Sequence, residues 1–124
     1  MKIFIIAGED SGDKLGAAII DGLRNALKNS PTFVGIGGTG MQSRGMNSIF
    51  PLSELSVMGF LEIASQYKNL KKRLNQTVSC ILDEQPDILL TIDAPEFCFR
   101  VAKRVKYLNR NIPIAHYVAP TVWA

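Results

Sequence analysis

Histidine and cysteine, which supply most zinc ligands in proteins, are scarce in this sequence. The 124 residues include one histidine, His116, and two cysteines, Cys80 and Cys98. The two cysteines do not form a CxxC pair, and no cluster of ligand-type residues stands near the histidine. We therefore predict no metal site built by the protein, and two buried, reduced thiols of the kind found in cytoplasmic proteins.

Long apolar runs are also missing, although 47% of the residues are hydrophobic. No segment approaches the roughly 20 apolar residues of a membrane-spanning helix. The N-terminal apolar run is short and leads into a cluster of glycine and aspartate, 8-GEDSGD-13, instead of the small residues of a cleavage site. These features argue against a signal peptide and are typical of a soluble protein with one domain.

Acidic residues are absent from the C-terminal part of the chain. Residues 1–96 have a net charge of −2, whereas residues 97–124 contain five Lys and Arg and no acid, for a net charge of +5. Such a segment suits a phosphate, a nucleic acid or an anionic membrane surface as a partner. A solvated helix face would carry the same charge, so both interpretations stay open here.

Short apolar runs alternate with helical patterns along the sequence. This alternation predicts a Rossmann-like α/β fold, in which a parallel sheet is covered by helices on both faces. Ligands bind such sheets at the carboxyl ends of the strands, where every conspicuous loop of this chain is expected to lie. We expect strands at 2–7, 32–36, 88–92 and 112–118, helices at 13–29, 60–84 and 97–108, a glycine-rich connection at 37–45, and an irregular segment at 47–63.

Two glycine-rich loops are candidate ligand sites. In 8-GEDSGD-13, Gly8 and Gly12 would let the backbone approach a ligand, and Ser11 or Asp13 would cap the next helix. The acids of this loop oppose a phosphate, so a sugar fits at least as well; a simple turn with a helix cap is the alternative.

The second loop contains 35-GIGGTG-40, which matches G-x-G-x-x-G at Gly35, Gly37 and Gly40. A dinucleotide-binding Rossmann module is therefore an alternative function. It is the weaker one, because the motif follows the second strand and no acidic residue ends the next strand.

Two segments near the middle and end of the chain raise further hypotheses. Asp93 and Glu96 in 88-ILLTIDAPEF-97 follow a buried strand, so either could be a general base at the rim of a site, although a turn alone explains the motif. Segment 55-LSVMGFLEI-63 either packs on the core or contacts lipid, with Lys68, Lys71, Lys72 and Arg73 meeting anionic headgroups. A membrane-surface domain without catalysis is thus a second alternative. His116, at the end of the last strand, is either structural or functional.

Taken together, five segments resemble the lipid-A-disaccharide synthase family, whose members are GT-B glycosyltransferases of lipid A biosynthesis. The segments are 8-GEDSGD-13, 37-GGTGM-41, 53-SELSVMGFLEI-63, 92-IDAPEF-97 and 116-HYVAPTVWA-124, in the family's order. The resemblance implies that residues 1–124 are the N-terminal, acceptor-side Rossmann-like domain of a longer protein. A C-terminal domain that binds the UDP-sugar is expected to be absent, so the isolated chain should be inactive.

The reaction implied by the resemblance condenses UDP-2,3-diacylglucosamine with 2,3-diacylglucosamine 1-phosphate, with inversion, to give a β-1,6-linked disaccharide and UDP. No cofactor is implied, since the UDP-sugar is a substrate, and no nucleic acid partner is expected. The implied location is cytoplasmic and peripheral on the inner membrane, and a homodimer stays open.

The resemblance also implies roles for individual residues. Asp93 matches the family's proposed base, and Glu96 is a neighbouring candidate. Arg100, Lys103 or Arg104 could approach the acceptor phosphate, by their charge. The implied substrate-binding residues are Gly8, Ser11, Gly12, Asp13, Gly37, Gly38, Met58 and His116, and the implied membrane or acyl contacts are Val57, Met58, Phe60 and Leu61.

Two positions depart from the family pattern. Thr39 replaces a proline after the paired glycines, which only loosens a turn preference. Cys98 replaces an asparagine, which removes an amide that could hold a sugar hydroxyl, so Cys98 is assigned no binding role.

Overall fold

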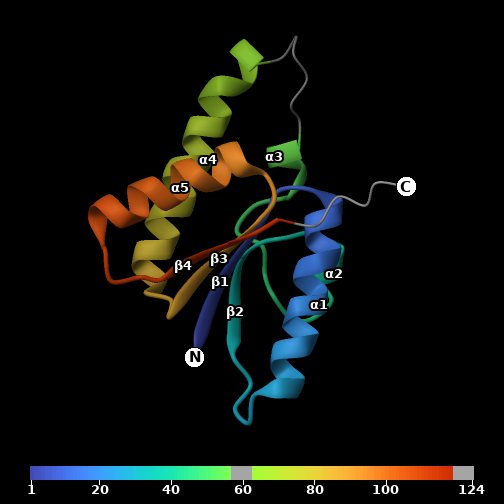
Figure 1. The fold of residues 1–124 in the computed structure, drawn as a ribbon. Helices are drawn as coiled ribbons and strands as arrows, with labels where there is room; N and C mark the ends of the chain where they lie inside the picture. Colours follow the sequence, from blue (N-terminus) through green and yellow to red (C-terminus); the bar gives the residue numbers. More distant parts are fainter. Residues whose placement is uncertain (57–62, 119–124) are drawn as a thin grey trace.

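A four-stranded parallel sheet forms the centre of the molecule (Figure 1). The computed structural model describes residues 1–56 and 63–118. In chain order the elements are β1 (Lys2–Ala7), α1 (Asp10–Ala26), β2 (Thr32–Ile36), α2 (Thr39–Gln42), α3 (Ser53–Ser56), α4 (Ile63–Glu84), β3 (Ile88–Ile92), α5 (Pro95–Leu108) and β4 (Ile114–Tyr117). The first three strands have the predicted bounds, and β4 is shorter than predicted.

The strand order is β2-β1-β3-β4, and all neighbours are parallel. The chain therefore leaves β1 toward one edge of the sheet and leaves β3 toward the other. The carboxyl ends of these two central strands lie side by side, since Ala7 pairs with Ile92. This reversal is a topological switch point, where open α/β sheets form their ligand crevice.

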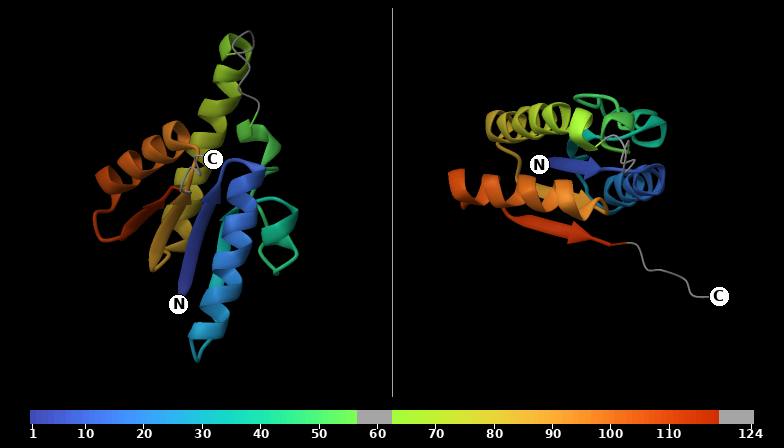
Figure 2. Two further views of the ribbon diagram at one scale, coloured as in Figure 1. Left: turned by 45° about the vertical axis from the view of Figure 1, so that its right-hand side comes forward. Right: turned by 90° about the horizontal axis from the view of Figure 1, so that it is seen from above.

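Helices cover both faces of the sheet, as predicted. Side chains of β1 alternate between the two faces, because successive residues of a strand point in opposite directions. Ile3 and Ile5 belong to the core beneath α1 and α2, whereas Phe4 and Ile6 belong to the core beneath α4 and α5. Figure 2 shows α1 and the α4–α5 pair on different sides of the strands. The predicted Rossmann-like α/β fold is thus confirmed.

Three local predictions were wrong. Helix α1 begins at Asp10, so Ser11 and Asp13 lie inside it, and its N-cap residue, Glu9, forms no side-chain cap. The helical pattern of residues 60–84 predicts Tyr67 on the apolar face of the helix, but its side chain is 56% exposed. Of the two thiols, Cys98 is buried, but Cys80 is only partly so. Propensity patterns place a helix more reliably than its first residue or the direction of each side chain.

The beginning of the irregular segment packs on the core. Phe50, Leu52 and Leu55 are all less than 10% exposed and belong to the same cluster as Phe4. For Leu55, core packing is therefore the correct interpretation. The predicted lipid or acyl contacts Val57, Met58, Phe60 and Leu61 lie outside the described residues.

Candidate functional site

The loops that follow β1 and β3 touch at the switch point. A Cβ atom added to Gly8 would lie 2.3 Å from the Cβ atom of Ala94, far inside van der Waals contact. Only glycine at position 8 lets the two loops approach this closely. The candidate site is therefore built on Gly8–Glu9 from one strand end and Asp93–Ala94 from the other.

Asp93 and Ala94 both have a left-handed backbone, with φ angles of 50° and 41°. Such angles cost non-glycine residues about 1–3 kcal/mol each, and they occur mostly where surrounding structure enforces them. Here the Asp93 N–H donates to the Tyr117 carbonyl at 3.0 Å, and Pro95 begins α5 immediately afterwards. The turn predicted from the sequence is thus real, and it holds the carboxyl-bearing residue at the rim of the crevice.

Glu96 lies in the first turn of α5 and is exposed, whereas Asp93 is partly buried. Helix α5 begins at Pro95, and its N-cap, Ala94, makes no side-chain hydrogen bond. The predicted start of this helix at Phe97, which would leave Glu96 in front of the helix, is therefore wrong. Of the two candidate bases, Asp93 is the one whose backbone the fold constrains.

Asp13 joins the two glycine loops from inside α1. Its carboxylate is 5% exposed and accepts hydrogen bonds from the backbone N–H groups of Gly38, Gly40 and Met41 at 2.8, 2.8 and 2.9 Å. These bonds satisfy a buried charge with donors that also cap the short helix α2. The structure therefore assigns Asp13 to holding the second glycine loop.

This arrangement bears on the dinucleotide alternative. A Rossmann loop binds pyrophosphate through free backbone N–H groups. In residues 37–41, the N–H of Gly37 donates to the Ser48 hydroxyl, and those of Gly38, Gly40 and Met41 donate to Asp13. Within residues 37–41, the N–H of Thr39 is the one that makes no hydrogen bond to another described residue. The second glycine loop therefore lacks the set of free donors that the dinucleotide hypothesis requires.

Two other glycines have packing roles. Gly35 lies within β2 at a φ of 146°, and a Cβ atom there would lie 1.8 Å from the Ile5 carbonyl oxygen. Gly12 is buried where α1 crosses the sheet, with a Cβ atom placed 3.4 Å from that of Ala7. Of the predicted contacts in the first loop, Gly8, Gly12 and Asp13 are buried, and Ser11 is exposed.

His116 is anchored by a residue that the sequence interpretation missed. Its Nδ1 atom lies 2.6 Å from Oγ1 of Thr91, which faces it across β3 and β4, and the ring of Phe99 packs on the imidazole with centroids 4.9 Å apart. Thr91 is itself 1% exposed. A polar residue within the apolar run 88-ILLTI-92 was the available signal for it.

The side chain of Cys98 completes this cluster. Burial raises the pKa of its thiol to about 12, a hydrogen bond with Thr91 lowers it, and the charge of Asp93 raises it again. The thiol is therefore protonated at neutral pH.

A second polar cluster ties α3 to α4. Glu54 accepts hydrogen bonds from Asn69 at 2.7 Å and from Arg73 at 3.0 Å, and these bonds lower the pKa of Glu54 below its ordinary value of 4.5. The Arg73 guanidinium also lies over the Phe50 ring, 4.8 Å from its centroid. The Arg73 guanidinium is therefore bound by other residues of the protein, and the prediction that it contacts anionic headgroups was wrong.

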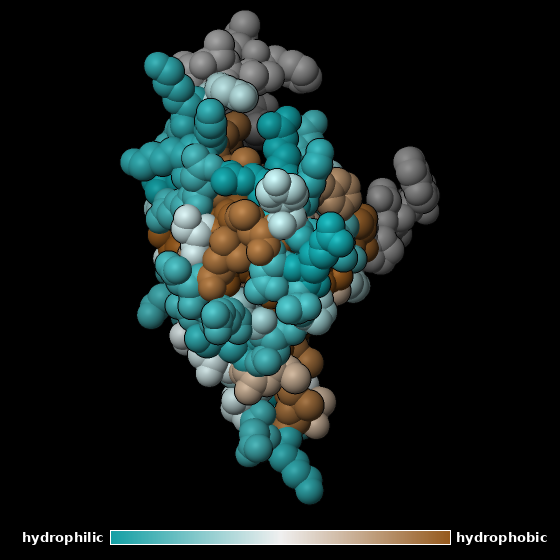
Figure 3. All heavy atoms as spheres, turned by 90° about the vertical axis from the view of Figure 1, so that its left-hand side faces the viewer, coloured by the Kyte–Doolittle hydropathy of each residue, from teal (hydrophilic) through white to brown (hydrophobic). Residues whose placement is uncertain are grey.

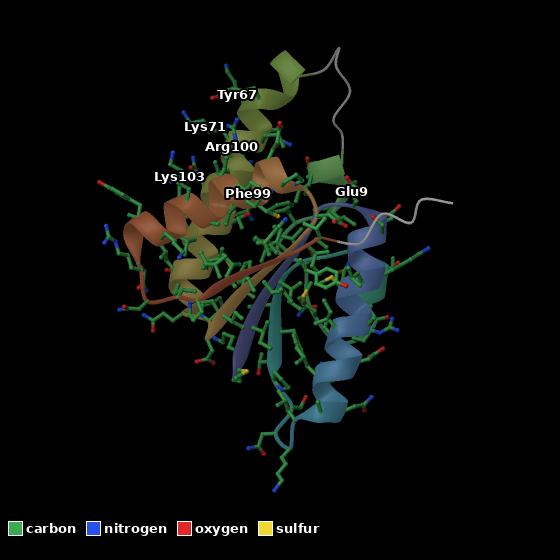
Figure 4. All side chains as sticks on the ribbon, viewed as in Figure 1. Glu9, Tyr67, Lys71, Phe99, Arg100 and Lys103 are labelled. Carbon is green, nitrogen blue, oxygen red and sulfur yellow. The ribbon has the colours of Figure 1, made fainter. Side chains whose placement is uncertain are left out.

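The face formed by α4 and α5 is cationic with an apolar centre. Figure 3 shows a hydrophobic area on this face enclosed by hydrophilic residues. An open groove of about 1040 Å³ lies here, with Leu74, Tyr107 and Leu108 among its lining residues. Exposed Tyr67 and Phe99 lie on the same side, near Lys71, Arg100 and Lys103 (Figure 4). No ion pair joins Arg100, Lys103 or Lys106 to an acid in the described part of the chain.

Neither a metal cluster nor a membrane span was found within residues 1–56 and 63–118. No group of three or more His, Cys, Asp and Glu side chains in this part could hold a metal ion. No helix there is both long and apolar enough to cross a bilayer.

The fold and the position of the site define an α/β protein of the Rossmann-like class with a candidate site at the carboxyl ends of its two central strands. Comparison with known sequences then identifies the family. The family description "Lipid-A-disaccharide synthetase" matches residues 3–124, and the chain belongs to this family.

Three similar proteins are all named lipid-A-disaccharide synthase. The protein from Rhodospirillum centenum is 45% identical over the whole chain, which covers 31% of that relative. The protein from Ruegeria pomeroyi is 48% identical over the whole chain, which covers 30% of that relative. A protein from Rhodopseudomonas palustris is 42% identical over 99% of the chain, and the match covers 31% of that relative. The chain thus spans about a third of the length of these relatives. The predicted resemblance is confirmed.

Proposed function

We propose that the chain is the N-terminal, acceptor-side domain of an inverting GT-B glycosyltransferase that makes lipid A disaccharide. The observation that carries this proposal is the constrained carboxyl-bearing residue Asp93 at the switch point of a domain of this family. The substrates proposed are UDP-2,3-diacylglucosamine and 2,3-diacylglucosamine 1-phosphate. A second domain, supplied by the rest of the complete protein, would bind UDP.

In this reaction the acceptor's 6-hydroxyl attacks the anomeric carbon of the donor sugar. A new C–O bond forms as the bond to the UDP oxygen breaks, and the attacking hydroxyl loses its proton. A hydroxyl is a poor nucleophile unless a positioned base takes that proton. Asp93 is the proposed base, because its backbone is held by Tyr117 on one side and by Pro95 on the other. Glu96 is the second candidate base, and it is exposed in the first turn of α5.

The acceptor sugar is proposed to lie at the first glycine loop, beside the exposed Ser11 at the start of α1, where the contact of Gly8 with Ala94 brings the two loops together. His116 is proposed to contact it from β4. For Gly37 and Gly38 a binding role is weakened, since their N–H groups are already bonded to Ser48 and Asp13. No cofactor is proposed: in GT-B enzymes helix dipoles and cationic side chains stabilise the leaving UDP.

We further propose that the domain works on the cytoplasmic face of the inner membrane, as a peripheral protein. Its substrates carry acyl chains, and its α4–α5 face combines unpaired cations with exposed aromatic rings, which is typical of surfaces that meet anionic headgroups. The proposed contacts with anionic headgroups are therefore the predicted lysines of α4 together with Arg100 and Lys103. Arg73 is not among them, because it is bonded to Glu54. A soluble acidic partner would need the same charge but not the exposed Tyr67 and Phe99.

The test is a transfer assay on the complete protein that carries this chain, with the two lipid substrates and release of UDP as readout. Formation of a β-1,6-linked disaccharide is the expected result. If the complete protein binds both substrates but forms no disaccharide, the proposed reaction is wrong. Titration with NAD tests the dinucleotide alternative, for which we expect no binding.

A further inference from the structure

A short hydrogen bond joins β3 to β4 near the carboxyl end of the sheet. Oγ1 of Thr91 lies 2.6 Å from Nδ1 of His116. Thr91 is 1% exposed, so water does not compete for this bond. The bond therefore holds one edge of the imidazole ring.

The bond can run in either direction, because Nδ1 donates in one tautomer of the imidazole and accepts in the other. The Thr91 hydroxyl has one proton, and Nδ1 can accept it. A neutral imidazole whose Nδ1 accepts this hydrogen bond carries its proton on Nε2. In that direction of the bond, Nε2 is a hydrogen-bond donor.

Nε2 of His116 is buried and has no hydrogen-bond partner among the described residues. Buried N–H groups are almost always paired, so an unpaired one requires an explanation. The ring cannot readily turn to find a partner, since Thr91 fixes one edge and Phe99 packs on it at 4.9 Å. Nε2 is thus held in place without a hydrogen-bond partner among the described residues.

This donor lies near the candidate base. Thr91 and His116 face each other in the register of β3 and β4, and one residue further on each strand ends. Beyond that point, the Asp93 N–H donates to the Tyr117 carbonyl at 3.0 Å. The two groups therefore lie at the same end of two neighbouring strands.

We propose that Thr91 is a positioning residue, which holds His116 as an Nε2–H donor for an oxygen of a bound sugar phosphate. The identity of this ligand as the acceptor rests on the proposed function, whereas the orientation and tautomer of His116 do not. A neutral N–H donor suits either a phosphate oxygen or a sugar hydroxyl. The two sources of that oxygen are separated by the choice of probe.

The first experiment measures the tautomer. The chain has one histidine, so ¹⁵N-histidine labelling gives the signals of a single imidazole. We expect the Nε2–H form in the wild-type chain and in Thr91→Ser, which keeps the hydroxyl. In Thr91→Val, which is similar in size but has no hydroxyl, we expect a mixture of both forms. A predominant Nδ1–H form in the wild type, or an unchanged tautomer in Thr91→Val, overturns the proposal.

The second experiment measures ligand contact in the complete protein with three probes: glucosamine 1-phosphate, glucosamine and inorganic phosphate. Glucosamine 1-phosphate should shift the His116 Nε2 signal. A similar shift with phosphate alone assigns the contact to a phosphate oxygen, and one with glucosamine alone assigns it to a hydroxyl. No shift of the His116 signal with any of the three probes overturns the proposal.

Kinetics separate this inference from the proposed function. Losing one well-positioned hydrogen bond weakens binding about tenfold. Thr91→Val should therefore raise KM for the acceptor about tenfold with a smaller change in kcat, and Thr91→Ser should restore it. An equal fall of kcat in both variants would indicate a merely structural role and overturn the proposal. Absence of transfer by the wild-type protein would instead contradict the proposed function and leave the tautomer result standing.

Discussion

Gly8 and Ala94 lie in direct contact across the carboxyl ends of β1 and β3, so that a methyl group at position 8 would lie 2.3 Å from the Ala94 Cβ atom. The contact joins the first glycine loop to the left-handed turn that carries Asp93. It is a place where backbone, and not side-chain chemistry, sets the shape of the candidate site. Small changes there should therefore affect both stability and the position of the proposed base.

Gly8→Ala should destabilise the protein by about 1–3 kcal/mol, the usual cost of forcing an extra methyl group into a packed site. It should also lower transfer activity, because the turn at Asp93 must move. Urea unfolding and the transfer assay measure the two effects. Combining it with Ala94→Gly removes the clash, so the double variant should recover most of the lost stability.

Gly22→Ala is the matched control for this substitution. Gly22 lies in α1, and a Cβ atom added there meets nothing within 4 Å. Alanine is a better helix former than glycine, so this variant should be more stable by about 0.5–1 kcal/mol. A destabilisation equal to that of Gly8→Ala would show that the contact with Ala94 is not the cause.

Asp13→Asn keeps the size of a buried side chain but replaces an acceptor oxygen by an amide that faces backbone N–H donors. We expect a loss of about 1–3 kcal/mol of stability, since a buried donor is left unpaired. Faster hydrogen exchange at the amides of Gly38, Gly40 and Met41 would locate the effect in the second glycine loop.

The control for Asp13 lies on the same helix. Asp21 is exposed and forms a surface ion pair with Arg44 at 3.2 Å. Exposed pairs contribute about 0–1 kcal/mol, so Asp21→Asn should change stability little. Similar losses in both variants would mean that the three backbone bonds of Asp13 contribute no more than a surface charge.

Asp93→Asn should lower kcat of the complete protein by about 100-fold to 10,000-fold, the range for loss of a general base. Stability should change little, because asparagine also tolerates a left-handed backbone. Glu96→Gln, on the exposed first turn of α5, is the comparison. A large fall in kcat for Glu96→Gln with near-normal turnover of Asp93→Asn would transfer the role of base to Glu96.

The combined variant Arg100→Glu/Lys103→Glu should bind anionic vesicles at least about 30-fold more weakly, since each cation near an anionic surface contributes about 1 kcal/mol. Co-sedimentation with phosphatidylglycerol vesicles measures this, and phosphatidylcholine vesicles should bind neither protein. Lys14→Glu/Lys28→Glu makes the same charge change at two exposed positions on or after α1. Equal losses in the two double variants would show a response to net charge and not to the α4–α5 face.

The pH dependence of stability should include a component from Glu54. Hydrogen bonds from Asn69 and then Arg73 lower its pKa in the folded protein. A lowered folded-state pKa stabilises the protein above the unfolded value, and this stabilisation disappears as the pH falls through the folded value. The difference in unfolding free energy between wild type and Glu54→Gln should therefore shrink on acidification below 4.5. A constant difference would contradict the role of the charge.

Much of the fold was predictable because local patterns and tertiary structure agree. The apolar runs at 2–7, 32–36 and 88–92 are strands with the predicted bounds, since each is short, apolar and separated from the next by a helical pattern. Asp93 was also identifiable, because a carboxylate directly after a buried strand must lie at a sheet edge. Its left-handed backbone was not, as nothing in Asp-Ala-Pro requires positive φ angles.

The roles of Asp13, Arg73 and Thr91 could not be predicted from the sequence. Asp13 has the spacing of a helix cap, yet its partners are 25 to 28 residues away. Arg73 stands among solvated lysines but turns toward Glu54, 19 residues before it. Thr91 reaches His116 only because β3 and β4 are neighbours.

The sequence by itself determined the α/β class, the strand positions and the family, because all three depend on the order and spacing of residues along the chain. The tertiary structure decided which polar groups are already bonded to one another. It assigned Asp13 to the second glycine loop, placed Gly8 against Ala94 and left Nε2 of His116 unpaired among the described residues. These outcomes depend on distances between segments that are remote in sequence, which a local pattern does not contain.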